Sequence, residues 1–468
     1  MADTESRGRQ ERRAAGKEIR GRVPREDLAH WAPPPDRRDP VQILIDQGDS
    51  RVADLVPVRY ARMLSSEFAF FRGAAAVMAS DLSYSDHTHL TVQLAGDAHL
   101  ANFGGYASAE RTFIFDVNDF DETLPGPFEW DLKRLVASFA VSGRARGFDE
   151  ATRARITARV VRTYRESVQE FSRMSRLEVW YSRMTAEDIE REFGGDAGKK
   201  QRRSFEKTVA KARSKNSERA LQKLTTTAAD GRISFDSNAP FMVPVSALVG
   251  DEDSTTYHHA AQAALVAYRR SLLSDRRVLF SGYRVVDLAR KVVGVGSVGT
   301  RCWVMLLMAD QDESDVLMLQ LKQADASVLE RYLGRSRTTH HGQRVVEGQR
   351  VMQASSDIML GWTQVELRGH HVDFYVRQMW DWKESADLET MDDTAMDIYA
   401  RMCGWTLARA HCRSGDRVAL AGYLGTSDAL DTAMTRYAEE YADQNAKDYA
   451  AMQDAASAGR IEVAASGW

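Results

Sequence analysis

The sequence predicts an α+β fold, in which a block of strands lies between two mainly helical regions. Apolar residues recur at helical spacing over 129–230 and 390–455, whereas continuous or alternating apolar runs gather between 281 and 378. Of the 468 residues, 43% are hydrophobic and 28% are charged, the balance of an ordinary globular protein. The length suggests about three domain-sized units or one enzyme with two lobes, and the composition excludes a wholly disordered or fibrous chain.

Charge and cysteine content exclude several classes of protein. The 63 Lys and Arg residues against 67 Asp and Glu residues give a net charge of −4, which argues against a nucleic-acid-binding function. Three cysteines, Cys302, Cys403 and Cys412, lack CxxC spacing, so neither disulfides nor a thiolate zinc site is expected. We therefore expect a reducing, cytoplasmic location. No apolar run reaches the roughly 18 residues needed to span a bilayer, so no membrane partner is expected.

The chain divides into four predicted regions. Residues 1–38 are rich in arginine up to the prolines at 33–35, and we expect a mobile basic tail. Residues 39–280 form a mainly helical region. Within it the pattern changes to strands at 90–95 and 112–117, which are expected to pair as a hairpin around a Gly104-Gly105 turn.

Two long helical patterns follow the expected hairpin. The first has apolar residues three or four positions apart, which predicts one buried helix face. These residues are Ile156, Val160, Tyr164, Val168 and Phe171. The second, over 199–223, is dense in lysine and arginine; we interpret it as a solvated helix face, with an anionic-substrate surface as the alternative.

Residues 281–383 carry most of the predicted strands. The expected order is strands at 283–293, 300–308 and 316–323, a helix at 343–353, and strands at 363–367 and 372–378. The last shows the clearest period of two, because Val372, Phe374 and Val376 alternate with polar or amphipathic residues. Residues 384–468 are predicted to return to helices.

Carboxylates and an amide gather at the ends of the two predicted strands of the hairpin region. Asp97 precedes Asn102 by five residues, the spacing at which phosphotransferases place a catalytic carboxylate and a metal-binding amide. The segment 116–122 then offers Asp116 and Asp119, and Mg²⁺ commonly takes one or two carboxylates together with substrate phosphates. The pattern predicts a magnesium site with either Asp116 or Asp119 as the second protein ligand.

These segments, GDAHLAN and DFD, resemble the GDxHxxN and DFx motifs of aminoglycoside and choline phosphotransferases, members of the protein-kinase-like superfamily. The resemblance implies that Asp97 is the catalytic carboxylate, with His99 as the motif's histidine, and that Asn102 and Asp119 bind metal. One position departs from the pattern, because Ala95 stands where those enzymes usually have a histidine.

A glycine-rich segment lies between the first two strands of the 281–383 block. Its candidate nucleotide-binding residues are Gly294, Gly296, Ser297 and Gly299. A strand follows, which disfavours a dinucleotide-binding turn and favours a kinase-type loop, whose glycines let backbone amides approach phosphates. Lys322, on the next strand, is the candidate for contacting the α and β phosphates. Glu347 is its expected acidic partner, with Glu330 as the alternative.

The strand block follows the catalytic segment, which reverses the usual kinase order. The resemblance therefore implies a protein-kinase-like two-lobed fold in circularly permuted form: a large lobe at 39–280 with the catalytic hairpin at 96–122, a small lobe at 281–383, and helices at 384–468 that return to the large lobe. Permutation is physically admissible, because stability depends on which surfaces meet and chain ends can move to exposed loops.

The chain as a whole resembles a bacterial family, the one catalogued as domain of unknown function 2252. The resemblance runs from about Asp39 to residue 450 and is carried by stretches such as 55–63, 68–73, 126–131 and 408–416. Within it, Asp131 resembles the helix-start aspartate of the kinase-like superfamily that braces the catalytic loop. The family is classed as kinase-like without an established substrate.

Taken with its resemblances, the sequence predicts an enzyme that transfers a phosphoryl group from Mg·ATP to a hydroxyl of a small-molecule acceptor. One alternative is a catalytically inactive module that binds nucleotide. The other is a metal-dependent hydrolase built on Asp97, His87, His89 and His99.

Overall fold

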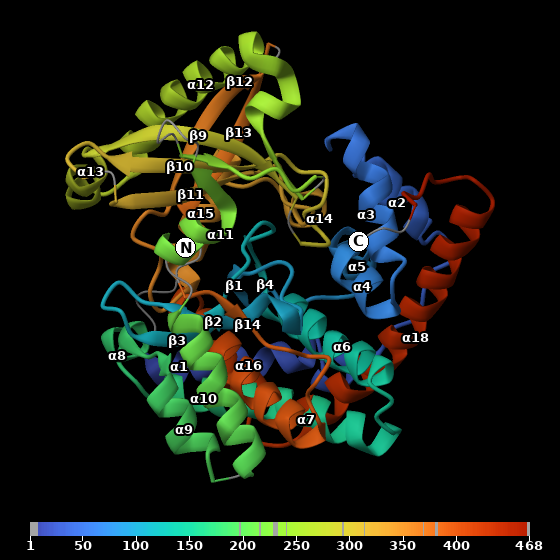
Figure 1. Ribbon diagram of the computed structural model, residues 1–468. Coiled ribbons are helices and arrows are strands. Elements are labelled where there is room, and N and C mark those ends of the chain that lie inside the picture. The colour runs from blue at the N-terminus through green and yellow to red at the C-terminus, as the bar shows by residue number, and fades with distance from the viewer. Residues whose placement is uncertain are drawn as a thin grey trace.

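The structure is a computed structural model of the 468-residue chain, and it describes residues 8–195, 198–214, 217–227, 233–239, 241–292, 294–312, 314–367, 369–379 and 382–465. It is a mixed α+β fold with several antiparallel sheets (Figure 1). A six-stranded sheet lies at the top of the view in Figure 1, and a body of helices with smaller sheets lies below it. No described helix is both long and apolar enough to cross a membrane.

The six-stranded sheet has the order β12-β13-β11-β10-β9-β8, and neighbouring strands are antiparallel. Its strands are β8 (Met242–Pro244), β9 (Tyr283–Lys291), β10 (Cys302–Ala309), β11 (Val316–Gln323), β12 (Gly361–Leu367) and β13 (His370–Gln378). The five strands predicted after residue 281 are therefore confirmed as strands. Val293, predicted as the end of the strand that begins at residue 283, lies outside the described residues. Arg368, in the predicted turn between the last two strands, also lies outside them.

Helices cover both faces of this sheet because its strands alternate. Leu307 and Leu319 pack beneath α12 (Val245–Ser271), whereas their neighbours Leu306 and Met318 pack against α11 (Ser217–Leu224). Helices α13 (Ser274–Phe280), α14 (Glu330–Leu333) and α15 (His341–Met352) complete this part. Residues 242–280, predicted to belong to the helical region, thus pack with the sheet instead, because β8 pairs with β9 and carries α12 across its face.

The helical body is built from two distant stretches of the chain. Its long helices are α6 (Phe128–Ala145), α7 (Glu150–Phe171), α16 (Asp393–Ser414), α17 (Arg417–Leu424) and α18 (Ala429–Ser457). Helix α16 packs against α7, and α18 packs against α6 and α7. The stripe from Ile156 to Phe171 is buried in this core, as predicted. Gly404 permits close packing, because a Cβ there would come within 2.5 Å of the Val160 carbonyl oxygen.

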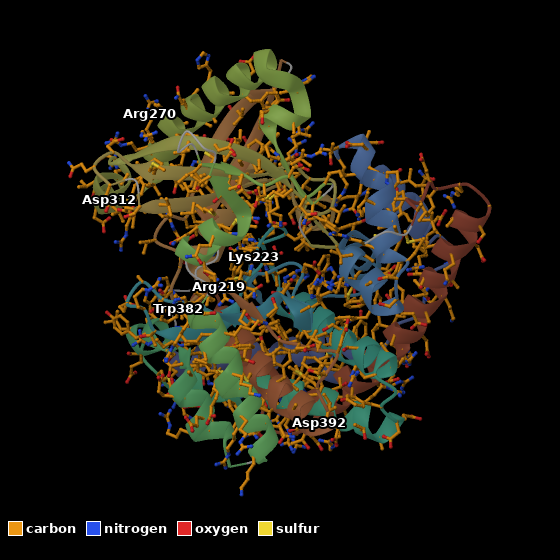
Figure 2. The ribbon with its side chains drawn as sticks, viewed as in Figure 1. Arg219, Lys223, Arg270, Asp312, Trp382 and Asp392 are labelled. Atoms are coloured by element: carbon orange, nitrogen blue, oxygen red, sulfur yellow. The ribbon has the colours of Figure 1, made fainter. Side chains whose placement is uncertain are left out.

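Shorter elements surround these helices. They are α2 (Pro40–Asp46), η3 (Ala53–Leu55), α3 (Val56–Met63), α4 (Glu67–Gly73), α5 (Ala75–Leu82), α8 (Arg176–Tyr181), α9 (Ala186–Phe193), α10 (Lys199–Arg213) and a hairpin of β6 (Thr225–Thr227) and β7 (Ile233–Phe235). The basic run falls on α10 and α11, where its described side chains are exposed. Arg219 and Lys223 of α11 lie between the six-stranded sheet and the helical body (Figure 2). Lys200 and Lys215 are outside the residues whose side chains are described.

The first 38 residues differ from the predicted mobile tail wherever they are described. They form α1 (Arg9–Glu18), η1 (Ile19–Gly21) and η2 (Arg25–Ala29), which pack against α17 and α18. Their arginines find carboxylates: Arg12 pairs with Asp416 at 2.6 Å, and Arg37 bridges Asp81 at 2.7 Å and Asp448 at 2.6 Å. The arginine content that suggested a solvated tail instead attaches this segment to the helical body. Residues 1–7 lie outside the described residues.

The predicted pairing of the strands near residues 90 and 115 is also wrong. Strand β1 (Thr91–Leu94) pairs with β4 (Leu124–Pro127), whereas β3 (Phe113–Val117) pairs with β2 (Phe103–Ala107). Strands β5 (Met184–Thr185) and β14 (Glu384–Ser385) extend the second sheet. The two glycines predicted as a turn lie inside β2, where a Cβ on Gly105 would overlap the ring of Phe113. They serve close packing within a strand rather than chain reversal.

Candidate active site

A cavity of about 230 Å³ lies where the loop after β1, the loop after β3, the glycine loop between β9 and β10, and helices α3 to α5 meet. Most of the predicted site residues line it, although they are far apart in the sequence. They are Asp97, His99, Asn102, Asp119, Gly294, Gly296 and Ser297. The structure also places Asp121 and Glu122 in this lining, two residues that were not predicted as site residues from the sequence.

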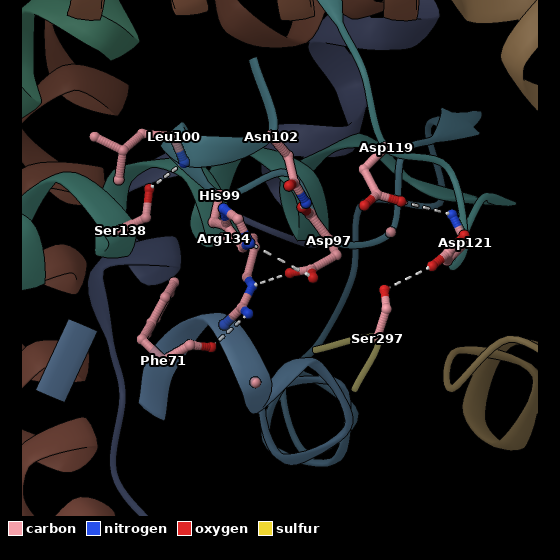
Figure 3. Close-up of polar contacts among 12 residues, drawn as sticks. Phe71, Asp97, His99, Leu100, Asn102, Asp119, Asp121, Arg134, Ser138 and Ser297 are labelled. Atoms are coloured by element: carbon pink, nitrogen blue, oxygen red, sulfur yellow. Dashed lines mark hydrogen bonds and ion pairs between the residues drawn. The ribbon is translucent and has the colours of Figure 1, made fainter. Parts of the chain in front are cut away.

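Asp97 is held at the edge of the cavity by the segment that follows it. Its carboxylate accepts a hydrogen bond from Arg134 Nε at 2.8 Å, and its side chain keeps 21% of its surface exposed (Figure 3). Asn102 closes the 3₁₀ turn η4 (Leu100–Asn102) and donates from Nδ2 to the Asp97 carbonyl at 2.9 Å. That bond orients the amide so that the Asn102 Oδ1 is left to accept a ligand.

Asp131, at the start of α6, braces the backbone before Asp97. Its two carboxylate oxygens accept hydrogen bonds from the amides of Ala95 at 2.7 Å and Gly96 at 2.9 Å. His411 Nε2 lies 3.2 Å from the same carboxylate, and its Nδ1 is 2.8 Å from the hydroxyl of Tyr164. Position 95 lacks the histidine of the phosphotransferase motif that this segment resembles. In this protein His411, from α16, reaches the Asp131 carboxylate instead.

His99 is buried beside the Asp97 carboxylate. It is only 3% exposed, and its Nε2 is 3.8 Å from Asp97 Oδ2. Burial lowers the pKa of His99 to about 3; the charge of Asp97 opposes this effect, and the charges of Arg72 and Arg134 add to it. The imidazole is therefore neutral at physiological pH, and we assign it a positioning role.

Lys322 lies on β11 and faces the two carboxylates of the DFD segment. Its Nζ contacts Asp121 Oδ2 and is 4.0 Å from Asp119 Oδ2. The hydroxyl of Tyr375 donates to the other Asp121 oxygen at 2.8 Å. Burial disfavours the charge on Lys322, but the nearby carboxylates outweigh this effect and raise its pKa. Burial likewise opposes ionisation of Asp119, yet the charge of Lys322 keeps its pKa below the ordinary value.

The expected partners of Lys322 are elsewhere. Glu347 lies on the exposed face of α15 and accepts a hydrogen bond from Gln343 at 2.6 Å. Glu330, the alternative, is 3.8 Å from Arg344. The buried face of α15 presents Arg344, which donates to main-chain carbonyls of the loops around the cavity. Both glutamate predictions are therefore wrong, and Asp121 is the acidic partner of the lysine.

The choice between Asp116 and Asp119 follows from their surroundings. Asp116 is 1% exposed, and its carboxylate accepts hydrogen bonds from Arg409 at 2.6 and 2.8 Å and from the amide of Ala354. It is therefore an ion-pair partner of α16 and not a cavity ligand. Asp119 and Asn102 both present oxygens to the cavity and suit a hard divalent cation. Among the described residues, no group of three or more His, Cys, Asp or Glu side chains could hold a metal ion.

The glycine loop reaches the same carboxylates from the other side. Ser297 Oγ donates to Asp121 Oδ2 at 3.2 Å (Figure 3). Gly294 and Gly299 have φ values of +67° and +91°, a backbone conformation that favours glycine. The loop rests on the N-terminal helices, because Val298 is fully buried among residues of η3 and α3 and the amide of Val52 donates to Gly299 at 2.7 Å.

Three arginines in the cavity lining were not selected as site residues from the sequence: Arg51, Arg59 and Arg72. Arg59 and Arg72 fall in segments 55–63 and 68–73, which carry the family resemblance, and this resemblance was the sequence signal that could have identified them.

A second cavity, of about 250 Å³, lies in the helical body between β2, β3, α9, α10 and α16. It is mainly apolar and contains none of the predicted site residues.

Most of the chain matches a known protein family. The family described as "Uncharacterized protein conserved in bacteria (DUF2252)" matches residues 51–455. No curated protein and no solved structure matches the chain.

Proposed function

This chain belongs to the DUF2252 family, and from the chemistry of its cavity we propose that it transfers a phosphoryl group from Mg·ATP to a hydroxyl of a small molecule. One observation carries the proposal. Lys322 contacts Asp121, 201 residues earlier in the chain, so the lysine strand, the DFD segment and the Asp97–Asn102 segment surround one cavity with the glycine loop. These are the parts that phosphoryl transfer needs.

The order of strands supports a kinase-like arrangement. The glycine loop joins β9 to β10, the lysine lies on β11, and α15 precedes the pair β12 and β13, which is the order of a kinase small lobe. In this chain the block follows the catalytic segment. We therefore propose a circularly permuted kinase-like fold, with the sheet as the small lobe and the helical body as the large lobe.

Each residue has a distinct role in the proposed reaction. Asp97, held by Arg134, orients the acceptor hydroxyl and takes its proton. Lys322 and the glycine-loop amides hold the phosphates, and Asn102 and Asp119 would hold the Mg²⁺ ion. When bound, that ion neutralises charge on the phosphate oxygens. The acceptor oxygen bonds to the γ-phosphorus, the bond from that phosphorus to the β,γ-bridging oxygen breaks, and ADP leaves.

Thermal unfolding with and without Mg·ATP tests the nucleotide site. Ligand at about 100 times its Kd adds about 2.7 kcal/mol of stability, so the midpoint of the wild-type protein should rise. Lys322→Ala should abolish the rise, because it removes the buried cation, whereas Lys207→Ala, at an exposed lysine of α10, should retain it. The midpoint of each variant without ligand reports whether it is folded.

A second variant covers the case in which Lys322→Ala does not fold. Asp119→Asn should keep a shift with ATP alone but lose the additional shift that Mg²⁺ provides, because it removes a charged oxygen from the cavity. Absence of any shift in the wild-type protein would contradict the proposed function.

A further inference from the structure

The cavity contains more positive charge than a nucleotide site built on one lysine requires. Three arginines line it: Arg51 lies in the turn before η3, Arg59 on α3 and Arg72 on α4. None of the three forms an ion pair with a carboxylate within the part of the chain that the structure describes. This sets them apart from Arg12, Arg37 and Arg134, which each have one.

The polar contacts of the three arginines go to neutral oxygens. Arg59 is fully buried and donates to the carbonyl of Gly73 at 3.1 Å and to the side chain of Gln47 at 2.8 Å, while its Nε has no partner among the described residues. Arg51 donates to the carbonyl of Val298. Arg72 has a buried Nε that no described residue accepts from.

Burying a guanidinium without an anion is costly, and proteins normally compensate for it with a carboxylate or a ligand. Burial lowers the pKa of each of the three side chains, which expresses this cost. Neutral carbonyl and amide oxygens meet part of this cost, and no described carboxylate pairs with the three side chains, so an anion that enters the cavity would stabilise them further. Arginine suits this task, because its planar fork binds phosphate or carboxylate oxygens in pairs.

The location of Arg72 indicates which ligand brings the anion. Arg72 shares the cavity lining with Asp97 and Asp119, and the charges of these two carboxylates oppose the effect of burial on its pKa, so both lie near it. Its carbonyl oxygen would be 3.3 Å from a Cβ on Gly296, which places its backbone under the glycine loop. Lys322, by contrast, contacts Asp121 on the nucleotide side. An anion beside Arg72 therefore lies close to Asp97, where the acceptor hydroxyl is placed, and also close to the glycine loop.

We infer that the three arginines bind an anionic group of the acceptor, a phosphate or a carboxylate, while its hydroxyl lies at Asp97. The acceptor is thus a hydroxylated small anion. This inference rests on the proposed function, because the acceptor is defined by the phosphoryl transfer. The alternative source of the same chemistry is a phosphate of the nucleotide itself, and the two sources predict different competition behaviour.

The test is calorimetric titration of the protein with inorganic phosphate, with and without a saturating Mg²⁺ complex of a non-hydrolysable ATP analogue. We expect phosphate to bind in both conditions, because its site is separate from the γ-phosphate position. Arg72→Gln should weaken phosphate binding by about tenfold or more, the loss expected for a charged hydrogen-bond donor, and leave analogue affinity within about twofold. Arg38→Gln, at an exposed arginine paired with Asp46, is the matched control and should change neither.

Three outcomes separate this inference from the proposed function. If the analogue excludes phosphate and Arg72→Gln weakens both ligands equally, the arginines serve the nucleotide and the inference is wrong. If wild-type protein binds analogue but no phosphate, the inference is also wrong while the proposed function stands. If phosphate binds and depends on Arg72 but the analogue does not bind, the anion site stands and the proposed function fails. Arg72→Lys, which keeps the charge, should recover part of the phosphate binding and so excludes misfolding as the cause.

Discussion

At the scale of single residues, Asp131 holds the segment that carries Asp97 by accepting hydrogen bonds from two consecutive amides. Asp131→Asn keeps the shape but offers one oxygen where two are used, so one buried amide is left facing a donor. We expect the free energy of unfolding to fall by about 1–3 kcal/mol in urea denaturation. Asp443→Asn, at an exposed carboxylate paired with Arg144, is the control and should cost less than about 1 kcal/mol. Equal losses in the two variants would contradict the bracing role.

Glu122 predicts a pH dependence of stability. Burial raises its pKa from 4.5 to about 7, aided by Asp121 and Asp97 and opposed by Arg344 and the amide of Val328. Between these two values the folded protein keeps a proton that the unfolded chain loses, so this group makes the free energy of unfolding fall as pH rises through that window. Across that window the decrease in the free energy of unfolding from this group is on the order of 2–4 kcal/mol.

Urea denaturation of the wild-type protein and of Glu122→Gln at several pH values measures this effect. The variant should lack this component, so the difference in unfolding free energy between the two proteins should change steadily from about pH 4.5 to about pH 7. A constant difference across that range would show that Glu122 ionises in the folded protein as it does in the unfolded chain.

The residues of the candidate site were predictable where the signal was local. Asp97 and Asn102 follow from their short spacing at a strand end, and Ser297 follows from its loop, whereas the spacing left Asp116 and Asp119 as alternatives. The partner of Lys322 was not predictable in this way. A helix presents one face to its neighbours, and the sequence does not say that α15 turns Arg344 inward and Glu347 outward. The arginine cluster was not predicted as a unit, because arginines are mostly exposed and the sequence does not show that residues 51, 59 and 72 line one cavity.

At the scale of elements, the turn between β1 and the catalytic segment depends on Gly96. Its φ is +83°, and a Cβ there would overlap the carbonyl of Glu122. Gly147, which follows α6, also has a positive φ, +72°, but a Cβ there would meet nothing within 4 Å. Substitution at Gly147 would therefore cost backbone strain alone, whereas substitution at Gly96 would cost both backbone strain and steric overlap.

Substitution by alanine at these two positions gives a matched pair. We expect Gly147→Ala to lower the free energy of unfolding by about 1–2 kcal/mol through backbone strain alone. Gly96→Ala should lose about 1–3 kcal/mol more, because the chain from β1 to Asp97 must move away from Glu122. Urea denaturation measures both losses, and a Gly96→Ala loss no larger than that of Gly147→Ala would rule out the crowding.

Elements were predictable where periodicity is strong, and their pairing was not. The strands after residue 281 and the long helix with its stripe from Ile156 to Phe171 follow from their patterns. The partner of β1 did not, because glycines mark turns more often than strand interiors, and Gly104-Gly105 lie within β2. Strand β8 was missed because three residues carry too little periodicity to recognise.

At the scale of the whole molecule, Arg37 is a nearly buried cation and one of the contacts that attach the N-terminal segment to the helical body. Arg37 pairs with Asp81 of α5 and Asp448 of α18, and these two carboxylates are 2% and 5% exposed. Arg37→Ala would leave both charges buried without their partner, so we expect a loss of about 3–5 kcal/mol in the free energy of unfolding. The neighbouring Arg38→Ala breaks an exposed pair with Asp46 and should cost less than about 1 kcal/mol.

A second measurement distinguishes this electrostatic cause from lost packing. In Arg37→Ala the unpaired carboxylates can take up protons, so part of the stability should return as pH is lowered through the carboxylate range. A loss of unfolding free energy that is the same at acidic and neutral pH would indicate lost packing instead.

The attachment of this segment could not be predicted from the sequence, because its partners lie up to 411 residues away in the chain.

The helical body is assembled from parts made at different times during synthesis. Helices α6 and α7 precede the six-stranded sheet in the chain, and α16 to α18, which cover them, follow it. A growing chain therefore exposes the apolar stripe of α7 until the sheet has left the ribosome, whereas the sheet itself is nearly contiguous and can fold as it emerges. The residues that line the cavity around Asp97 all precede α16, but His411 of that helix reaches the Asp131 carboxylate that holds the Asp97 segment. This support is therefore added only when the final helices are made.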